Sequence, residues 1–194
     1  NEALDLTSLP RRMVIAGGGY IAVEFAGIFA RLGVAVTIII RGDHLLRGFD
    51  HDIRLHVEQE MIRIGIEVRA GCQITAIEKL GEHFRLQISE SSAIETDVVF
   101  YAMGRAPNTR TLGLEDIAVE MRDNGAIIVD ENSSTTVDSI FAIGDCTDRN
   151  NLTPVAIAEG RALAETWHND NPQTVSYENI ATAVFSQPPI GTVG

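Results

Sequence analysis

A run of glycines near the start of the chain has the spacing of a dinucleotide-binding turn. Gly17, Gly19 and Ala22 form the pattern G-x-G-x-x-A, directly after the apolar run at 13–16 and at the start of a helical apolar pattern. Gly17 permits a tight turn, Gly19 lets the backbone approach a pyrophosphate, and Ala22 allows close packing of helix on strand. Free N–H groups at the helix N-terminus attract phosphates. The pattern predicts a dinucleotide site; the alternative is a turn that is tight for structural reasons alone.

The end of the next expected strand indicates which dinucleotide is bound. NAD sites carry Asp or Glu at this point, where the carboxylate accepts hydrogen bonds from the ribose hydroxyls. Here the strand ends in Arg41, and Arg47 follows six residues later. Guanidinium groups hold a 2′-phosphate through charge-assisted hydrogen bonds, so the pair predicts a preference for NADP over NAD on the order of 10²–10⁴. Asp43, between them, is a mild counterweight, and the alternative is that both arginines are ordinary surface charges.

A second candidate site lies in the C-terminal third of the chain. An expected strand ends in Gly144 and Asp145, and a helix is expected to start near Thr153 and Pro154. An aspartate in this place can accept hydrogen bonds from a polyol, and the N-terminus of the helix adds a partial positive charge. Viewed alone, these residues are equally consistent with a turn aspartate and an N-cap threonine.

Composition excludes several other classes of function. The formal net charge is −12 and no block of Lys and Arg compensates for it, which argues against binding to nucleic acid or to a membrane surface. The absence of a bilayer-length apolar run and of a signal-peptide pattern favours a cytoplasmic chain. Cys72 and Cys146 are too far apart for a CxxC motif and are expected to be small core residues. The five histidines form no metal-ligand pattern, so no metal is expected: His44, His51, His56, His83 and His168.

The periodicity of apolar residues predicts an α/β fold. A Rossmann-like βαβ unit is expected from a strand at 12–16, a helix ending at Gly33 and a strand at 34–40, followed by a helix at 50–65 and a strand at 66–68. Alternating segments at 74–77, 84–88 and 97–101 predict an antiparallel meander. Further on, we expect short strands at 126–129 and 140–143 and a helix at 153–167. The segment 183–194 is expected to begin a strand that has no element to pair with.

Five segments, in this order, resemble the flavoprotein disulfide reductases, and most closely the glutathione reductases: GGGYIAVEFAGIFARLG, IRGDHLLRGFD, YAMGRAPNT, TTVDSIFAIGDCTDRNNLTPVAIAEGRALAE and AVFSQPPIGTVG. The two arginines narrow the resemblance to the NADPH-using branch that contains the glutathione and trypanothione reductases. The resemblance implies an NADP-binding domain at 1–108, the returning segment of an FAD-binding domain at 109–170, and the start of a dimer-interface domain at 171–194.

The resemblance also implies roles for individual residues. Tyr20 matches the tyrosine that lies over the flavin and swings aside for nicotinamide, and Glu24 matches the acid beside the flavin. Without the resemblance, a partly buried core tyrosine and a solvated glutamate explain these two residues nearly as well. The expected NADP residues are Gly17, Gly19, Tyr20, Ile21, Ala22, Glu24, Arg41, Arg47, Gly104 and Arg105, and the expected FAD residues are Gly144, Asp145 and Thr153.

For the whole protein, the resemblance implies hydride transfer from NADPH to FAD and then electron transfer to a disulfide, with glutathione disulfide as the first choice and a homodimer as the assembly. Trypanothione, mercuric and lipoamide-type substrates remain alternatives. The family's redox cysteine pair and catalytic histidine have no counterpart in this sequence. The chain alone is therefore expected to bind NADP(H) weakly to moderately, to hold no FAD stably and to have no reductase turnover. A different class, a stand-alone module that senses NADPH without chemistry, is also open.

Overall fold

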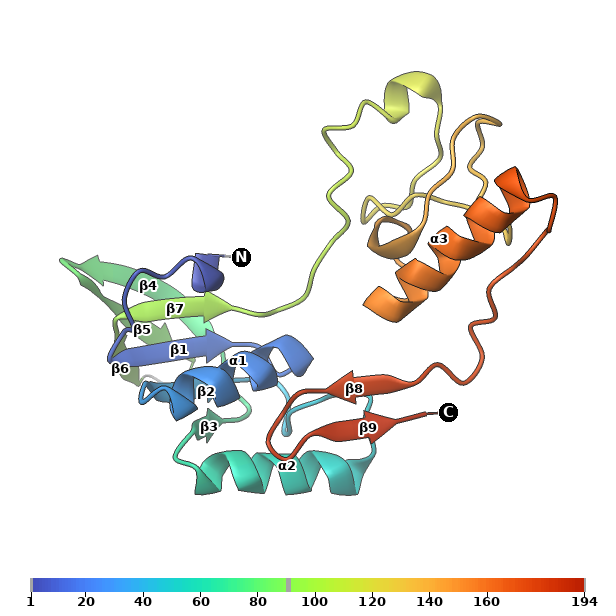
Figure 1. Ribbon diagram of the computed structural model, residues 1–194. Coiled ribbons are helices and arrows are strands. Elements are labelled where there is room, and N and C mark those ends of the chain that lie inside the picture. Colours follow the sequence, from blue (N-terminus) through green and yellow to red (C-terminus); the bar gives the residue numbers. More distant parts are fainter. Residues whose placement is uncertain (1, 90–91, 194) are drawn as a thin grey trace. The chain divides into compact units, whose positions relative to one another are not determined.

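The structure is a computed structural model that describes residues 2–89 and 92–193. The chain divides into two compact units, whose α-helices and strands are labelled in Figure 1. Unit 1 comprises the residues up to Gly104 together with Ala183–Thr192, and unit 2 comprises Arg105–Thr182 and, among the described residues, Val193. The main segment of unit 2 therefore lies, in sequence, between two parts of unit 1.

The regular elements of unit 1 include two α-helices, α1 (Tyr20–Arg31) and α2 (His51–Arg63), after a short 3₁₀ turn, η1 (Glu2–Leu4). Its strands are β1 (Arg12–Ala16), β2 (Ala35–Ile39), β3 (Glu67–Arg69), β4 (Ile74–Leu80), β5 (His83–Ile88), β6 (Ala93–Thr96) and β7 (Val98–Tyr101). The later pair is β8 (Thr182–Val184) and β9 (Ile190–Thr192), and unit 2 contains η2 (Glu115–Ile117), η3 (Gly144–Thr147) and α3 (Thr153–His168).

A four-stranded parallel sheet in the order β3-β2-β1-β7 forms the centre of unit 1. Alternate residues of its central strand enter different cores, because successive side chains in a strand point to opposite faces. Met13 and Ile15 belong to the cluster that contains the buried residues of α1 and α2, whereas Val14 packs with Leu86 and Ile88 of β5. Helices thus cover one face and the antiparallel sheet covers the other. The predicted α/β class, with a Rossmann-like unit and an antiparallel sheet, is confirmed.

The antiparallel sheet differs from the prediction in its third strand. Its order is β4-β5-β6, and the segment predicted as the third strand is instead β7, which pairs in parallel with β1. The sequence predicted β7 as part of the antiparallel sheet because the apolar run at 98–101 directly follows β6, which belongs to that sheet. Asp97 separates them: its carboxylate accepts hydrogen bonds from the backbone N–H groups of Arg11 and Arg12, each at 3.0 Å. The chain therefore leaves one sheet and enters the other at this residue.

The expectation of an unpaired strand near the C-terminus was wrong. β8 pairs with β9, and Val184 and Ile190 are buried in the core of unit 1 beside the residues of α1 and α2. The intervening Pro188 and Pro189 hid the second strand, because prolines demote a strand in a sequence pattern. Gly194, where the predicted strand ended, lies outside the described residues.

Unit 2 contains less regular structure than the sequence predicted. The segments expected as strands at 126–129 and 140–143 form only isolated bridges, Met121 with Ile127 and Ser134 with Phe141. The expected helix is α3, which has Pro154 in its first turn. A small core of Val119, Ile127 and Ala142 lies beneath these turns.

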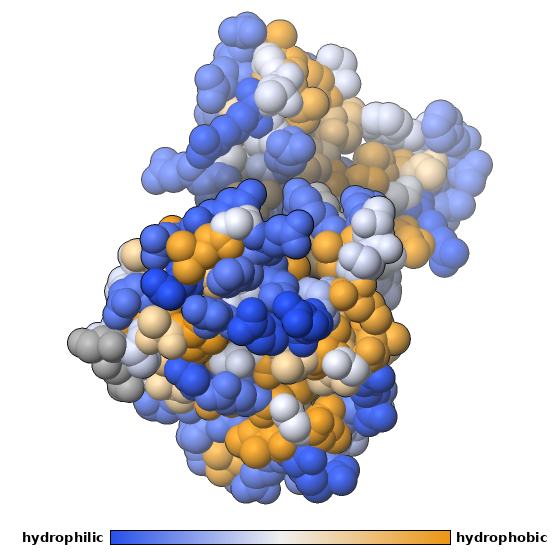
Figure 2. Space-filling view, turned by 90° about the vertical axis from the view of Figure 1, so that its left-hand side faces the viewer, coloured by the Kyte–Doolittle hydropathy of each residue, from blue (hydrophilic) through white to orange (hydrophobic). Residues whose placement is uncertain are grey.

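Figure 2 shows the hydrophobic residues of one face in several patches separated by hydrophilic ones. Among the described residues, no helix combines the length and the apolar character that a membrane crossing requires.

Candidate functional site

The glycine turn lies between the C-terminal end of β1 and the N-terminus of α1. Gly17 has a φ of +131°, and a Cβ at this position would lie 2.2 Å from the carbonyl oxygen of Ala102. Gly19, the N-cap of α1, is different, because a Cβ there would meet nothing within 4 Å. Gly17 is thus required by the fold. Gly19 borders open space beside the first N–H groups of the helix, as a phosphate-binding turn needs.

The middle glycine was missing from the predicted set. A Cβ on Gly18 would lie 2.8 Å from Cγ2 of Ile40, the residue just after β2. The carbonyl of Gly18 also accepts a hydrogen bond of 2.7 Å from the backbone N–H of Leu46. Ala22 is fully buried, as the close helix–strand packing requires, and Ile21 is half-buried beside it.

The two arginines lie on the loop that this hydrogen bond joins to the glycine turn. Arg41 and Arg47 are both exposed, and within residues 2–89 and 92–193 neither side chain has a recorded hydrogen bond or ion pair. Between them, Leu45 and Leu46 are buried, with exposed fractions of 0% and 1%. The loop is therefore anchored in the core by two buried leucines, and on each side of them lies an exposed guanidinium that has no bonded partner among the described residues.

Tyr20 and Glu24 occupy the first turns of α1. Tyr20 begins the helix and is 45% exposed, so the alternative of a core tyrosine is not what the structure contains. Glu24 is half-buried, and its Oε1 accepts a hydrogen bond of 2.9 Å from the backbone N–H of Phe185, just after β8. Only one carboxylate oxygen is engaged in this contact, which leaves the other as an acceptor.

Gly104 and Arg105 lie at the division between the two units. Gly104 has a φ of +120° and ends the first segment of unit 1, whereas Arg105 begins unit 2 and is exposed. Their expected contact with NADP stays a prediction.

In unit 2, the predicted polyol site is a short 3₁₀ turn, η3. Gly144 has a φ of +69° and is buried, and Asp145 is exposed, with no recorded side-chain partner among the described residues. Thr153 is the first residue of α3, and Leu152 rather than Thr153 is the N-cap. An aspartate with unused acceptor oxygens on a turn of fixed shape is suited to hold hydroxyl groups.

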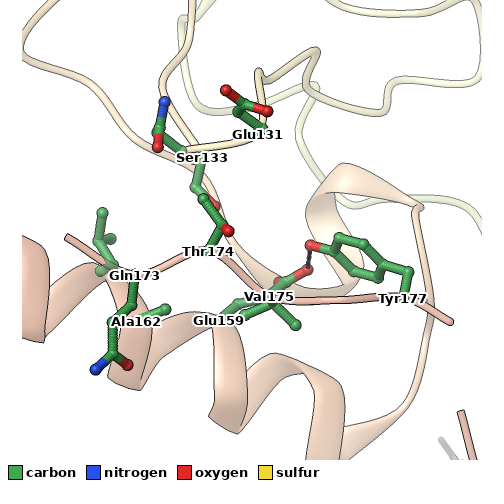
Figure 3. A pocket seen from close by; sticks show the side chains of 10 residues that line it. Glu131, Ser133, Glu159, Ala162, Gln173, Thr174, Val175 and Tyr177 are labelled. Carbon is green, nitrogen blue, oxygen red and sulfur yellow. Dashed lines mark hydrogen bonds between the residues drawn. The ribbon is translucent and has the colours of Figure 1, made fainter.

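A buried ionic network, which the sequence analysis did not predict, fixes the shape of this turn. The side chain of Glu159 on α3 is 1% exposed and accepts hydrogen bonds from the N–H of Gly144 at 2.5 Å and from the hydroxyl of Tyr177 at 2.6 Å. Nη2 of Arg149 lies 3.1 Å from Oε1 of Glu159, and its guanidinium lies 5.1 Å from the centre of the Tyr177 ring. Figure 3 shows the Glu159–Tyr177 pair beside a small cavity of about 10 Å³. This volume is roughly what a single water molecule needs, so the cavity is too small to hold a cofactor.

The network could have been suspected from the pattern of α3. The buried positions of the helix are Val155, Glu159 and Ala162, at spacings of four and three residues. A glutamate within an apolar stripe is nearly always paired when it is fully buried. No comparable signal points to Phe185 as the partner of Glu24, because the two are 161 residues apart.

Burial raises the pKa of Tyr177 from 10.0 to about 12, and the hydrogen bond to Glu159 acts in the same direction. The fold favours the protonated phenol, so this stabilisation is complete below about pH 10 and is lost as the pH rises towards about 12. We expect the tyrosinate absorbance of the wild-type chain to include a step near pH 12 that is missing from Tyr177→Phe. A step near pH 12 that persists in Tyr177→Phe would contradict the prediction.

Cys146 lies on the η3 turn next to Asp145, and His44 lies on the loop between the two arginines, whereas Cys72 is outside both candidate sites. Cys72 is buried in the smaller core of unit 1, and Cys146 is half-buried in unit 2, where burial raises the pKa of its thiol. In the part of the chain that the structure describes, no cluster of three or more His, Cys, Asp and Glu side chains is arranged to hold a metal ion.

Residues 1–160 match the family model described as pyridine nucleotide-disulphide oxidoreductase. The chain belongs to this family. A glutathione reductase of Burkholderia cepacia is 46% identical over 194 residues, which are 100% of this chain and 43% of that protein. A trypanothione reductase of Trypanosoma congolense is 42% identical over 198 residues, covering 100% of this chain and 40% of that protein. The chain therefore spans less than half the length of these family members.

A solved structure of the same family has a closely similar fold. The HOCl-induced flavoprotein disulfide reductase RclA of Escherichia coli matches with a TM-score of 0.93 at 30% sequence identity, over 99% of this chain and 44% of that one. The arrangement of strands and helices described above is thus that of a disulfide reductase of this family.

Proposed function

We propose that this chain is the NADPH-binding portion, and part of the FAD site, of a glutathione-disulfide reductase. One observation carries the choice of cofactor: the loop with Arg41 and Arg47 is hydrogen-bonded to the glycine turn, through Leu46 N–H and Gly18 O at 2.7 Å. A pyrophosphate at the turn and a 2′-phosphate at the loop are parts of one adenine dinucleotide. A single ligand would therefore engage both features.

The residues of unit 1 fit an NADP molecule. In this proposal, the N–H groups at the start of α1 bind the pyrophosphate, the open space beside Gly19 admits it, and the two arginines bind the 2′-phosphate. Tyr20 covers the nicotinamide end and Glu24 is the acid beside the flavin. Gly104 is a further proposed contact at the end of this segment, and Arg105, the next residue in the sequence, is proposed as a contact from the first residue of unit 2.

The residues of unit 2 fit the polyol chain of FAD. Asp145 accepts hydrogen bonds from ribityl hydroxyls on a turn that Gly144 shapes, and Thr153 contributes from the start of α3. When bound, the cofactors supply hydride transfer from NADPH to the flavin and onward reduction of a disulfide. The role of this chain is to bind and orient them.

Glutathione disulfide is the proposed substrate because the glutathione reductase of Burkholderia cepacia is more similar to this chain, at 46% identity, than the trypanothione reductase of Trypanosoma congolense, at 42%. The second candidate substrate is trypanothione. Steady-state oxidation of NADPH by the whole protein, with each disulfide in turn, tests this choice. Faster turnover with trypanothione than with glutathione disulfide would reverse it.

The choice of cofactor can be tested on the chain itself. We expect NADPH to bind more tightly than NADH, by a factor on the order of 10²–10⁴, because two guanidinium groups hold the extra phosphate. In the double variant Arg41→Gln, Arg47→Gln this preference should fall to within about tenfold, with NADH binding unchanged. Arg31→Gln, at the end of α1, is the matched control. Equal affinities of the wild-type chain for NADPH and NADH in a calorimetric titration would refute the role of the arginines.

A further inference from the structure

Two side chains of α2 hold the loop that carries the arginines. Nε of Arg54 donates a hydrogen bond of 2.7 Å to the carbonyl of Leu45, and its Nη2 donates one of 3.2 Å to the carbonyl of His44. Glu58, one turn further along α2, accepts a hydrogen bond of 3.2 Å from the N–H of Leu45 through Oε2. Its Oε1 lies 3.5 Å from Nδ1 of His44. We call Arg54 and Glu58 the α2 clamp.

The α2 clamp and the glycine turn fix the loop from two directions. The clamp binds backbone groups of His44 and Leu45, and the very next residue, Leu46, donates its N–H to the carbonyl of Gly18. Leu46 has a φ of +53°, which is uncommon for a leucine and needs support from its surroundings. The position of Arg41 and Arg47 is therefore set by backbone contacts of the residues between them.

The clamp is separate from the contacts that fold α2. The helix is anchored in the core by Val57 and Met61, with exposed fractions of 1% and 2%, and its N-terminus is capped by Asp50. The recorded side-chain contacts of Arg54 and Glu58 go to residues 44 and 45 alone among the described residues. Removing them should loosen the loop while α2 stays in place.

We propose that Arg54 and Glu58 are positioning residues for cofactor selectivity: they hold the loop so that both arginines meet the 2′-phosphate together. This inference rests on the proposed function of the loop. A preformed site does not lose the freedom of the loop on binding, so its affinity is higher than that of the same residues on a mobile loop. The α2 clamp should therefore raise the affinity for NADPH and leave the affinity for NADH nearly unchanged.

Charge alone makes a different prediction, which separates the two explanations. Arg54 is a cation and Glu58 an anion near a phosphate site, so a purely electrostatic role would leave Arg54→Lys unchanged and would raise NADPH affinity in both Glu58→Gln and Glu58→Ala. If the α2 clamp instead positions the loop, Arg54→Lys and Glu58→Ala should lower NADPH affinity, and Glu58→Gln should leave it nearly unchanged. The reason is that Arg54→Lys keeps the charge but loses the contact with two carbonyls, and Glu58→Ala loses both the charge and the acceptor. Glu58→Gln keeps an acceptor for the N–H of Leu45.

The experiment measures the affinities of the 194-residue chain for NADPH and NADH, and for adenosine 2′,5′-bisphosphate and AMP, which differ only in the 2′-phosphate. We expect Arg54→Lys and Glu58→Ala to lower the affinity for NADPH and for the bisphosphate by roughly tenfold or more. The affinities of these variants for NADH and AMP should stay within about twofold of the wild type. Glu58→Gln should bind all four ligands about as tightly as the wild type. Arg63→Lys and Glu60→Gln are the controls, because these two residues lie on the same helix and pair with each other, with Nη2 of Arg63 2.7 Å from Oε2 of Glu60.

The possible failures are distinguishable. A wild-type chain that does not prefer NADPH would overturn the proposed function on which the inference rests. A wild-type chain that prefers NADPH, with Arg54→Lys and Glu58→Ala unchanged, would overturn the inference alone. Thermal unfolding is measured for every variant, and a large loss of stability in Arg54→Lys would also overturn it, because the residue would then support the fold rather than the selectivity of the loop.

Discussion

Replacing Gly17 by alanine is expected to destabilise unit 1 strongly. The new Cβ would lie 2.2 Å from the carbonyl oxygen and 2.7 Å from the carbonyl carbon of Ala102, which are backbone atoms that cannot rotate away. Ala102 is itself held by a hydrogen bond of 2.8 Å from its N–H to the carbonyl of Ala16. The φ of +131° adds strain for any residue with a side chain. Strain and overpacking together should lower the free energy of unfolding by about 3 kcal/mol or more.

Gly19→Ala is the matched control for this prediction. A Cβ on Gly19 has open space around it, so the free energy of unfolding should stay within about 0.5 kcal/mol of the wild type. Denaturation followed by far-ultraviolet circular dichroism measures both variants, and NADPH titration of Gly19→Ala should show weaker binding in a folded chain. A stable Gly17→Ala chain would contradict the assignment of Gly17 to the fold.

Glu159→Ala is expected to destabilise unit 2 by roughly 3–5 kcal/mol, because it removes one partner of a buried ion pair. The guanidinium of Arg149 would lose its carboxylate, and its Nε already has no hydrogen-bond partner among the described residues. The N–H of Gly144 and the hydroxyl of Tyr177 would also lose their acceptor. Since these contacts hold the turn that carries Asp145, the proposed FAD contact should fail together with the stability of the unit.

The single tryptophan of the chain reports this effect directly. Trp167 lies on α3, and the centre of its ring lies 4.1 Å from the centre of the Phe141 ring in an edge-on contact, so its fluorescence should follow the unfolding of unit 2. Glu131→Gln is the control, because it removes a negative charge from an exposed residue beside the same cavity and should change stability by less than about 0.5 kcal/mol. If Glu159→Ala and Glu131→Gln unfold alike, the network does not stabilise the turn.

Local patterns predicted the elements of unit 1 well. The first strand was predicted at the residues that β1 occupies, and the helix after the glycines is α1. The reason is that glycine spacing, helix stops and β-branched runs act over a few residues and are present in the sequence itself. The candidate residues of the glycine turn and of the arginine loop were found in the same way.

Long-range contacts account for what the sequence could not predict. The pairing of β7 with β1 and the pairing of β6 with β5 depend on which sheet each apolar run joins, and adjacent runs carry no mark of that choice. The α2 clamp depends on backbone groups of His44 and Leu45, and any sequence supplies such groups. The expected strands of unit 2 failed because their apolar residues pack beneath turns, where burial does not require a regular strand.

The position of Val184 and Ile190 has a consequence for the order in which the chain can fold. Both side chains are buried in the core of unit 1, although the segment Arg105–Thr182 of unit 2 lies between them and the rest of that core in the sequence. Contacts between such distant residues form slowly, because a long loop must close first. During synthesis from the N-terminus, the residues up to Gly104 emerge with this part of their core uncovered, and β8 and β9 cover it only after unit 2 has been made.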